Sequence, residues 1–160
     1  VQTCALPIFL NRGGMVNKYI GDAVMAVFGA PKSYPDHARR ALAAAIDMVQ
    51  EGKDFREWMQ QRFPDRGLPE FAIGVGLHTG TCVVGDIGSE RRTEFTAIGD
   101  TVNAASRLEG VTKELGVWLV ASAATLKAAG EGITTGKTET VTVKGRAEPI
   151  EVFEVVAMKE

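Results

Sequence analysis

The sequence predicts an α+β domain in which a mixed, largely antiparallel sheet packs against helices. Short runs of alternating apolar and polar residues, separated by tight turns, are typical of β-hairpins. Longer segments with apolar residues every three or four positions are typical of amphipathic helices. The two kinds of segment follow one another in the order ββαββαβαββ, which favours a sheet with helices on one face over a doubly wound parallel sheet.

Turn and capping residues indicate where these segments begin and end. Gly21-Asp22 is a hairpin turn, Asp36 is a suitable N-cap for a long helix that has a weak point at Gly52, and Gly116 ends a second long helix. Residues 85–94 are polar and charged, so we expect a loop or arm there. The expected elements are a helix end at 9–12, strands at 15–20 and 23–28, a helix at 37–62, strands at 71–77, 81–84 and 95–98, a helix at 101–115, a strand at 117–120, a helix at 122–129, and a hairpin of 138–144 and 150–156.

Composition excludes several classes of function. The chain has 160 residues, enough for one domain with a sizeable core, and its formal net charge of −2 gives no reason to expect nucleic acid or a membrane surface as a partner. No apolar run approaches the roughly 20 residues that a membrane helix needs, so we expect a soluble piece. The two cysteines, Cys4 and Cys82, lie far apart and favour a reduced, cytoplasmic domain, although the parent protein is free to be membrane-anchored.

The first eight residues do not fit the pattern that follows them. Residues 1–8 show no periodicity that continues into Phe9-Leu10, and they resemble the translation of a sequencing-adapter oligonucleotide joined in frame to a gene fragment. We therefore expect residues 1–8 to be non-native and residues 9–160 to form a domain that is incomplete at its N-terminus. A genuine N-terminal strand is the alternative.

Three polar segments occupy places where a strand or helix would favour apolar residues. Asp22 at the hairpin tip suits a hard cation such as Mg²⁺, although Gly-Asp is also ordinary turn chemistry. Asn103 and Arg107 share one helix face near its N-terminus, where they are suited to stabilise charge on phosphorus; a capped helix with an exposed arginine is the alternative. Arg91-Arg92 match phosphate geometry, but adjacent arginines also occur in solvated loops.

Together, these segments resemble the class III adenylyl and guanylyl cyclase catalytic domain. The resemblance runs from about Gly14 to Val156 and rests on Lys-x-x-Gly-Asp from Lys18, His78-Thr79-Gly80, and Ile-Gly-Asp-Thr-Val-Asn-x-Ala-x-Arg-Leu-Glu from Ile98. It implies a ferredoxin-like fold, a homodimer with active sites at the interface, and two Mg²⁺ or Mn²⁺ ions per site. The family's first strand, with one of its two metal aspartates, has no counterpart here, so we expect this chain alone to be inactive.

The resemblance also assigns a role to each candidate residue. The implied site residues are Asp22 for the metal, Lys18 and Thr96 for the purine, Asn103 and Arg107 for the ribose and transition state, Arg91 for the polyphosphate, and Lys144 (with Arg146 as alternative) for the terminal phosphates. Guanylate cyclases of this family are expected to have Glu and Cys at the two purine positions. A lysine donates to adenine's ring nitrogen but cannot accept from guanine's N–H groups, so Lys18 favours ATP.

The implied function is that of an adenylate cyclase in signal transduction, which makes cyclic AMP and pyrophosphate by metal-assisted attack of the ribose 3′-hydroxyl of ATP on the α-phosphate. An upstream sensor domain is expected in the parent. A guanylate cyclase and a catalytically silent nucleotide-binding or dimerising module are the alternatives. A GGDEF-like diguanylate cyclase shares the core fold, but its glycine-rich signature hairpin is absent.

Overall fold

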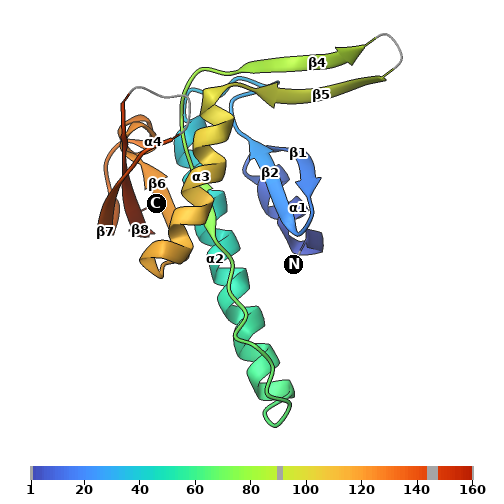
Figure 1. The fold of residues 1–160 in the computed structure, drawn as a ribbon, viewed down its shortest axis with the longest axis vertical. Coiled ribbons are helices and arrows are strands. Elements are labelled where there is room, and N and C mark those ends of the chain that lie inside the picture. The colour runs from blue at the N-terminus through green and yellow to red at the C-terminus, as the bar shows by residue number, and fades with distance from the viewer. Residues whose placement is uncertain (1, 90–91, 144–147, 160) are drawn as a thin grey trace.

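The computed structural model describes residues 2–89, 92–143 and 148–159, and these residues form an α+β fold, as predicted. After an N-terminal helix, the described elements follow the predicted order of strands and helices (Figure 1). They are α1 (Gln2–Asn11), β1 (Met15–Ile20), β2 (Ala23–Val27), α2 (His37–Arg62), β3 (Val75–Leu77), β4 (Val83–Ser89), β5 (Arg92–Ile98), α3 (Asp100–Leu115), β6 (Leu119–Ser122), α4 (Ala123–Ala129), β7 (Ile133–Val141) and β8 (Ile150–Met158).

The described strands form one mixed sheet and two hairpins. The four-stranded sheet has the order β3-β6-β8-β7, in which β3 pairs with β6 in parallel and the other pairs are antiparallel. The hairpins are β1-β2 and β4-β5, each antiparallel. No helix in the described part of the chain is long and apolar enough to cross a membrane.

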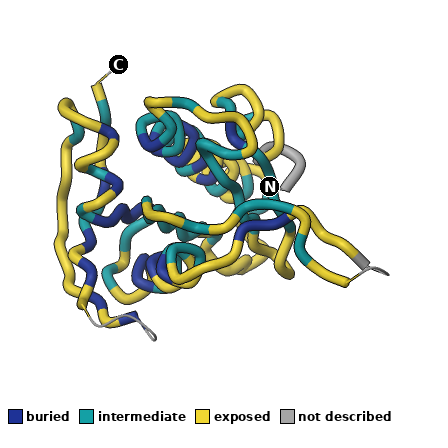
Figure 2. The backbone as a smooth tube through the Cα atoms, turned by 90° about the horizontal axis from the view of Figure 1, so that it is seen from above, coloured by how far each residue is buried: buried dark blue, intermediate teal, exposed yellow. Residues whose placement is uncertain are grey.

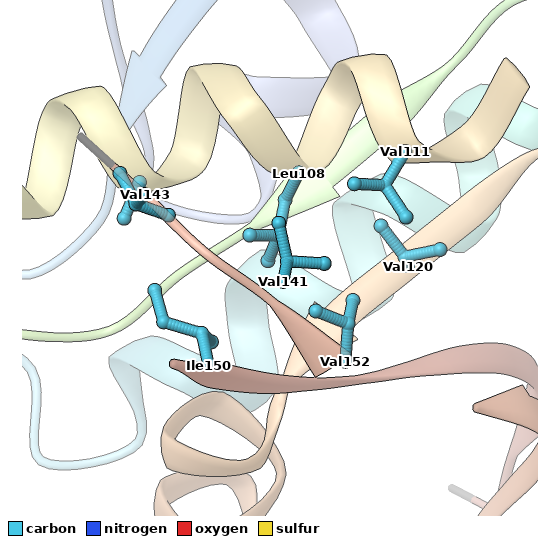
Figure 3. Packing of buried hydrophobic residues seen from close by; sticks show 8 residues of the cluster. Leu108, Val111, Val120, Val141, Val143, Ile150 and Val152 are labelled. Atoms are coloured by element: carbon cyan, nitrogen blue, oxygen red, sulfur yellow. The ribbon is translucent and has the colours of Figure 1, made fainter. Parts of the chain in front are cut away.

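The four-stranded sheet is covered on both faces, so the prediction of helices on one face is wrong. Leu108 and Val111 of α3 pack with Val120 on one face (Figure 3), whereas Leu119 and Ala121 pack with α2 on the other. Successive residues of a strand point to opposite faces, and all four residues of β6 are buried. An apolar run that is buried on both faces is the mark of a central strand between two layers.

Glycines allow two unusually close contacts between elements. A Cβ atom on Gly76 of β3 would lie 2.3 Å from the backbone nitrogen of Glu109, so β3 lies directly against the backbone of α3. A Cβ atom on Gly52 of α2 would lie 3.0 Å from the ring of Trp118. Gly52 is therefore a packing position between α2 and the residue before β6, which corrects its interpretation as a weak point.

The predicted helix ends are confirmed in position, with one difference in bonding. Gly116 ends α3 in the left-handed conformation with φ of 66°, as a C-terminal glycine should. Asp36 precedes α2, but its side chain makes no capping hydrogen bond. It accepts a hydrogen bond from Arg40 instead, at 2.8 Å, and this bond lowers the pKa of Asp36 below its ordinary value.

The charged segment 85–94, predicted as a loop or arm, is an arm made of two paired strands in its described residues. Its described residues belong to β4 and β5, whose antiparallel pairing runs from Val83 opposite Ile98 to Ser89 opposite Arg92. The hairpin projects from the body of the molecule, where its residues are mostly exposed or half-buried (Figures 1 and 2). Glycines and charges lower strand propensity, but here the regular pairing of the two strands outweighs it. Conversely, residues 71–74, predicted as strand, lie outside β3.

Candidate active site

The purine-contacting candidates meet where β1 lies against β5. The Asn17 side-chain nitrogen donates to the carbonyl oxygen of Phe95 at 2.9 Å, and the Thr96 hydroxyl donates to the Asn17 side-chain oxygen, also at 2.9 Å. Beside them, the Lys18 ammonium forms an ion pair with Glu94 at 2.9 Å. Two hairpins that are distant in sequence are thus joined by side-chain bonds around Lys18 and Thr96.

A β-bulge explains how neighbouring residues of β1 both reach β5. Val16 pairs with Ala26 and Lys18 pairs with Met25, so Asn17 is the extra residue in the strand. In a regular strand, residues 17 and 18 would point to opposite faces, whereas a bulge changes the direction of a side chain. Polar side chains at 17 and 18 therefore both bond to β5.

The candidate metal ligand Asp22 is exposed in the β1–β2 turn, after Gly21 at φ of 62°. In the described part of the chain, no group of three or more His, Cys, Asp or Glu side chains is placed to hold a metal ion. A single exposed carboxylate does not fit the requirements of two ions, because Mg²⁺ needs several oxygen ligands in octahedral geometry. The described residues therefore do not form the two-ion site by themselves.

The phosphate candidates Asn103 and Arg107 lie on α3, and both are exposed. The Arg107 guanidinium donates to the two carboxylate oxygens of Glu114, at 2.6 and 3.4 Å. This hydrogen bond raises the pKa of Arg107 above its ordinary value, so the guanidinium stays charged. Gly110 lies between Arg107 and Glu114 on the helix, and a Cβ atom there would lie 3.6 Å from a guanidinium nitrogen of Arg107. The arginine side chain therefore runs along the helix over this glycine.

The His78-Thr79-Gly80 motif joins strand ends to helices. The His78 ring nitrogen Nδ1 lies 2.9 Å from the Ser122 hydroxyl, and Thr79 donates to Thr125 of α4 at 3.0 Å. Ser122 and Thr125 are fully buried, and their bonds connect the ends of β3 and β6 to the start of α4. The motif therefore has a structural role between the strand ends and α4, as expected for a histidine at a strand end.

The structure gathers the predicted residues into two groups. Lys18 and Thr96 lie together between β1 and β5, and Asn103 and Arg107 share α3. Arg91, Lys144 and Arg146 lie outside the described residues. The sequence interpretation assigned no role to Asn17 or Glu94, and the available signal was the pair of adjacent polar residues, Asn17 and Lys18, between apolar residues of the strand.

This fold and site define a domain of the nucleotide cyclase class. The sequence model of the family described as "Adenylate and Guanylate cyclase catalytic domain" matches residues 13–156, and the chain belongs to this family.

Among curated proteins, the chain is 36% identical over 145 residues to Adenylate cyclase 1 of Rhizobium meliloti, which covers 91% of the chain and 21% of that protein. It is 37% identical over 150 residues to an adenylate cyclase of Anabaena cylindrica, and the match covers 92% of this chain and 29% of that protein. The chain thus spans less than a third of these relatives.

Two solved structures resemble the fold closely. The guanylyl cyclase Cya2 superimposes with a TM-score of 0.85 at 31% identity, covering 99% of this chain and 77% of that one. The adenylyl cyclase CyaB from P. aeruginosa superimposes with a TM-score of 0.83 at 29% identity, and the match covers 99% of this chain and 80% of that one. Because both kinds of cyclase are similar to this chain, the base that it selects has to be argued from its own residues.

Proposed function

We propose that the protein containing this chain is an adenylate cyclase, which converts ATP to 3′,5′-cyclic AMP and pyrophosphate. The observation that carries the proposal is the joint position of Lys18 and Thr96 at the contact between β1 and β5. A lysine ammonium has only donors, so it suits the ring-nitrogen acceptor of adenine and opposes the N–H group of guanine. The family relatives named adenylate cyclase agree with this proposal.

In the proposed reaction, the 3′-oxygen of ATP bonds to the α-phosphorus, and the bond from that phosphorus to the oxygen shared with the β-phosphate breaks. The hydroxyl proton passes to solvent and pyrophosphate leaves. Asn103 orients the ribose through its amide, and Arg107 offsets the negative charge that grows on the transferring phosphoryl group. Arg91 and Lys144 bind the remaining phosphates.

Divalent metal ions serve the nucleotide cyclase family generally, and we propose Mg²⁺ or Mn²⁺ for this protein. Asp22 is one ligand of the ions in this proposal. When bound, the ions neutralise phosphate charge and lower the pKa of the attacking hydroxyl.

We further propose that the protein works as a cytoplasmic homodimer with its sites at the interface, controlled by an upstream sensor domain. The support is a series of exposed apolar side chains on the two hairpins, of the kind that marks interaction surfaces. They are Tyr19 (49% exposed), Ile20 (58%), Val83 (64%), Phe95 (40%) and Ile98 (48%). In such a dimer we propose that Asp22 of one subunit shares a site with the purine residues Lys18 and Thr96 and with Asn103 and Arg107 of the other.

The decisive experiment supplies ATP and GTP separately to the full-length protein and identifies the cyclic product by mass spectrometry. We expect cyclic AMP at a higher kcat/KM than cyclic GMP, and we expect Lys18→Met to reduce that preference, because the wrong base leaves site groups unpaired. A guanylate cyclase is the second candidate, favoured by the similarity to Cya2. Faster turnover of GTP would establish it, and failure with both nucleotides would favour the silent module.

A further inference from the structure

The Asn17 carboxamide is held between β1 and β5 in one orientation. The carbonyl oxygen of Phe95 can only accept, so the Asn17 atom that faces it at 2.9 Å must be the side-chain nitrogen. The side-chain oxygen then faces the Thr96 hydroxyl at 2.9 Å. The reversed amide would place two acceptor oxygens against each other, and it is therefore excluded by the backbone of β5.

This orientation determines the hydrogen-bonding state of Thr96. A hydroxyl has one hydrogen to donate and two lone pairs that accept. Because the Asn17 oxygen can only accept, Thr96 donates its single hydrogen to Asn17 and keeps only acceptor capacity for a ligand. Thr96 is 5% exposed and its bond to Asn17 is part-buried, so turning the hydrogen away would take a hydrogen-bond partner from the Asn17 oxygen at a cost in free energy.

Lys18 supplies a hydrogen-bond donor beside the acceptor Thr96. One of its three N–H donors is used by Glu94, and its side chain is still 32% exposed. The pair therefore offers an acceptor, Thr96, beside a donor, Lys18. Adenine presents an amino donor beside a ring-nitrogen acceptor and matches this pair, whereas guanine presents a carbonyl acceptor beside an N–H donor and opposes it at both positions.

We propose that Asn17 is the positioning residue that selects adenine, because it keeps Thr96 as an acceptor for the amino group of the base. The inference rests on the proposed function, since it concerns the same purine site. This arrangement depends on the bulge at Asn17. Without the extra residue, the amide and the Lys18 ammonium would lie on opposite faces of β1. Base selection thus depends on a side chain that need not touch the base.

The test compares Asn17→Ala with Asn17→Asp in the full-length protein. Alanine removes the acceptor, so the Thr96 hydroxyl is free to donate to the guanine carbonyl, and the ATP-to-GTP ratio of kcat/KM should fall by about tenfold, the value of one hydrogen bond. Aspartate keeps an acceptor for Thr96 but loses the donor to Phe95. It should therefore keep the ratio within about twofold, even if it lowers the melting temperature.

Two further variants separate hydrogen-bond direction from general damage. In a Thr96→Val background, Asn17→Ala should cause no further fall in the ratio, because the hydroxyl on which it acts is gone. Thr93→Ala removes a different hydrogen bond of the same hairpin, from Thr93 to the Ser89 carbonyl at 3.3 Å, and should leave the ratio unchanged. The fold of each variant is checked by circular dichroism.

The analogues 3′-deoxy-ATP and 3′-deoxy-GTP lack the attacking hydroxyl. Their dissociation constants therefore measure the base preference without turnover. A wild-type protein that cyclises neither nucleotide but binds the adenine analogue more tightly, with the preference lost in Asn17→Ala, would refute the proposed function and support the role of Asn17. An unchanged ratio in folded Asn17→Ala, or an equal loss in Asn17→Asp, would overturn the inference.

Discussion

Replacing Gly76 with alanine is expected to force α3 away from the four-stranded sheet. The added Cβ would lie 2.3 Å from the nitrogen of Glu109, 2.7 Å from the carbonyl carbon of Leu108 and 2.9 Å from the oxygen of Ala105. All three atoms belong to helix backbone, which cannot change rotamer to make room. The strain must therefore be relieved by moving α3 or β3 as a whole.

The expected cost follows from this geometry. Overpacking a core typically costs about 1–3 kcal/mol, and a clash with backbone belongs at the upper end of that range, about 3 kcal/mol. For a chain of this size, each kcal/mol lowers the melting temperature by about 2–4 °C, so Gly76→Ala should melt about 6–12 °C below the wild type. Thermal unfolding followed by circular dichroism at 222 nm, with urea titration as a second measure, checks this value.

Gly85→Ala is the matched control. Gly85 lies in β4, and a Cβ atom there would have nothing within 4 Å. Its substitution should change the free energy of unfolding by less than about 0.5 kcal/mol. If Gly76→Ala unfolds within this margin of the wild type as well, then β3 and α3 are not in the close contact that the structure shows.

Three other predictions concern the site. In the full-length protein, Arg107→Ala should lower kcat about 10²–10³-fold with little change in KM, because in the proposed reaction the guanidinium meets charge that appears mainly in the transition state. Steady-state kinetics with an unchanged kcat would contradict this. Glu114→Gln should alter the free energy of unfolding by less than about 1 kcal/mol in urea titrations, since the Arg107–Glu114 pair is exposed on both sides. The 160-residue chain alone should produce no detectable cyclic nucleotide with Mg²⁺ or Mn²⁺; activity that disappears in Asp22→Ala would show that a second aspartate is dispensable.

Much of the fold follows from local sequence signals. The helix of residues 37–62 was predicted with the bounds that α2 has, because its apolar spacing is regular and Asp36 precedes it. The β1–β2 hairpin was predicted from the turn residues Gly21-Asp22 between two short runs that were expected to be strands. In these places, one stretch of chain contains both the periodicity and the signal that ends it.

The differences arise where a distant partner decides the structure. The glycines and charges of residues 85–94 predicted a loop or arm without strands, but the pairing of Asp86 with Phe95 and of Ile87 with Glu94 makes this arm a β-hairpin. The bulge at Asn17 is a shift in the pairing of β1 with β2, and no residue of β1 alone reveals it. Its consequence, the bonds from Asn17 to β5, needs both hairpins in place.

Selection of the base is separable from membership of the family. The long motif from Ile98 to Glu109 lies mostly on α3, and its proposed role is in phosphate chemistry, which ATP and GTP share. The proposed base contacts lie instead on β1 and β5, and in our proposal the direction of one hydrogen bond, from Thr96 to Asn17, decides whether the site accepts or donates. If this proposal holds, replacing a single amide changes the preferred nucleotide while the fold and the phosphate-binding groups stay as they are, which agrees with the similarity of this chain to both adenylyl and guanylyl cyclases.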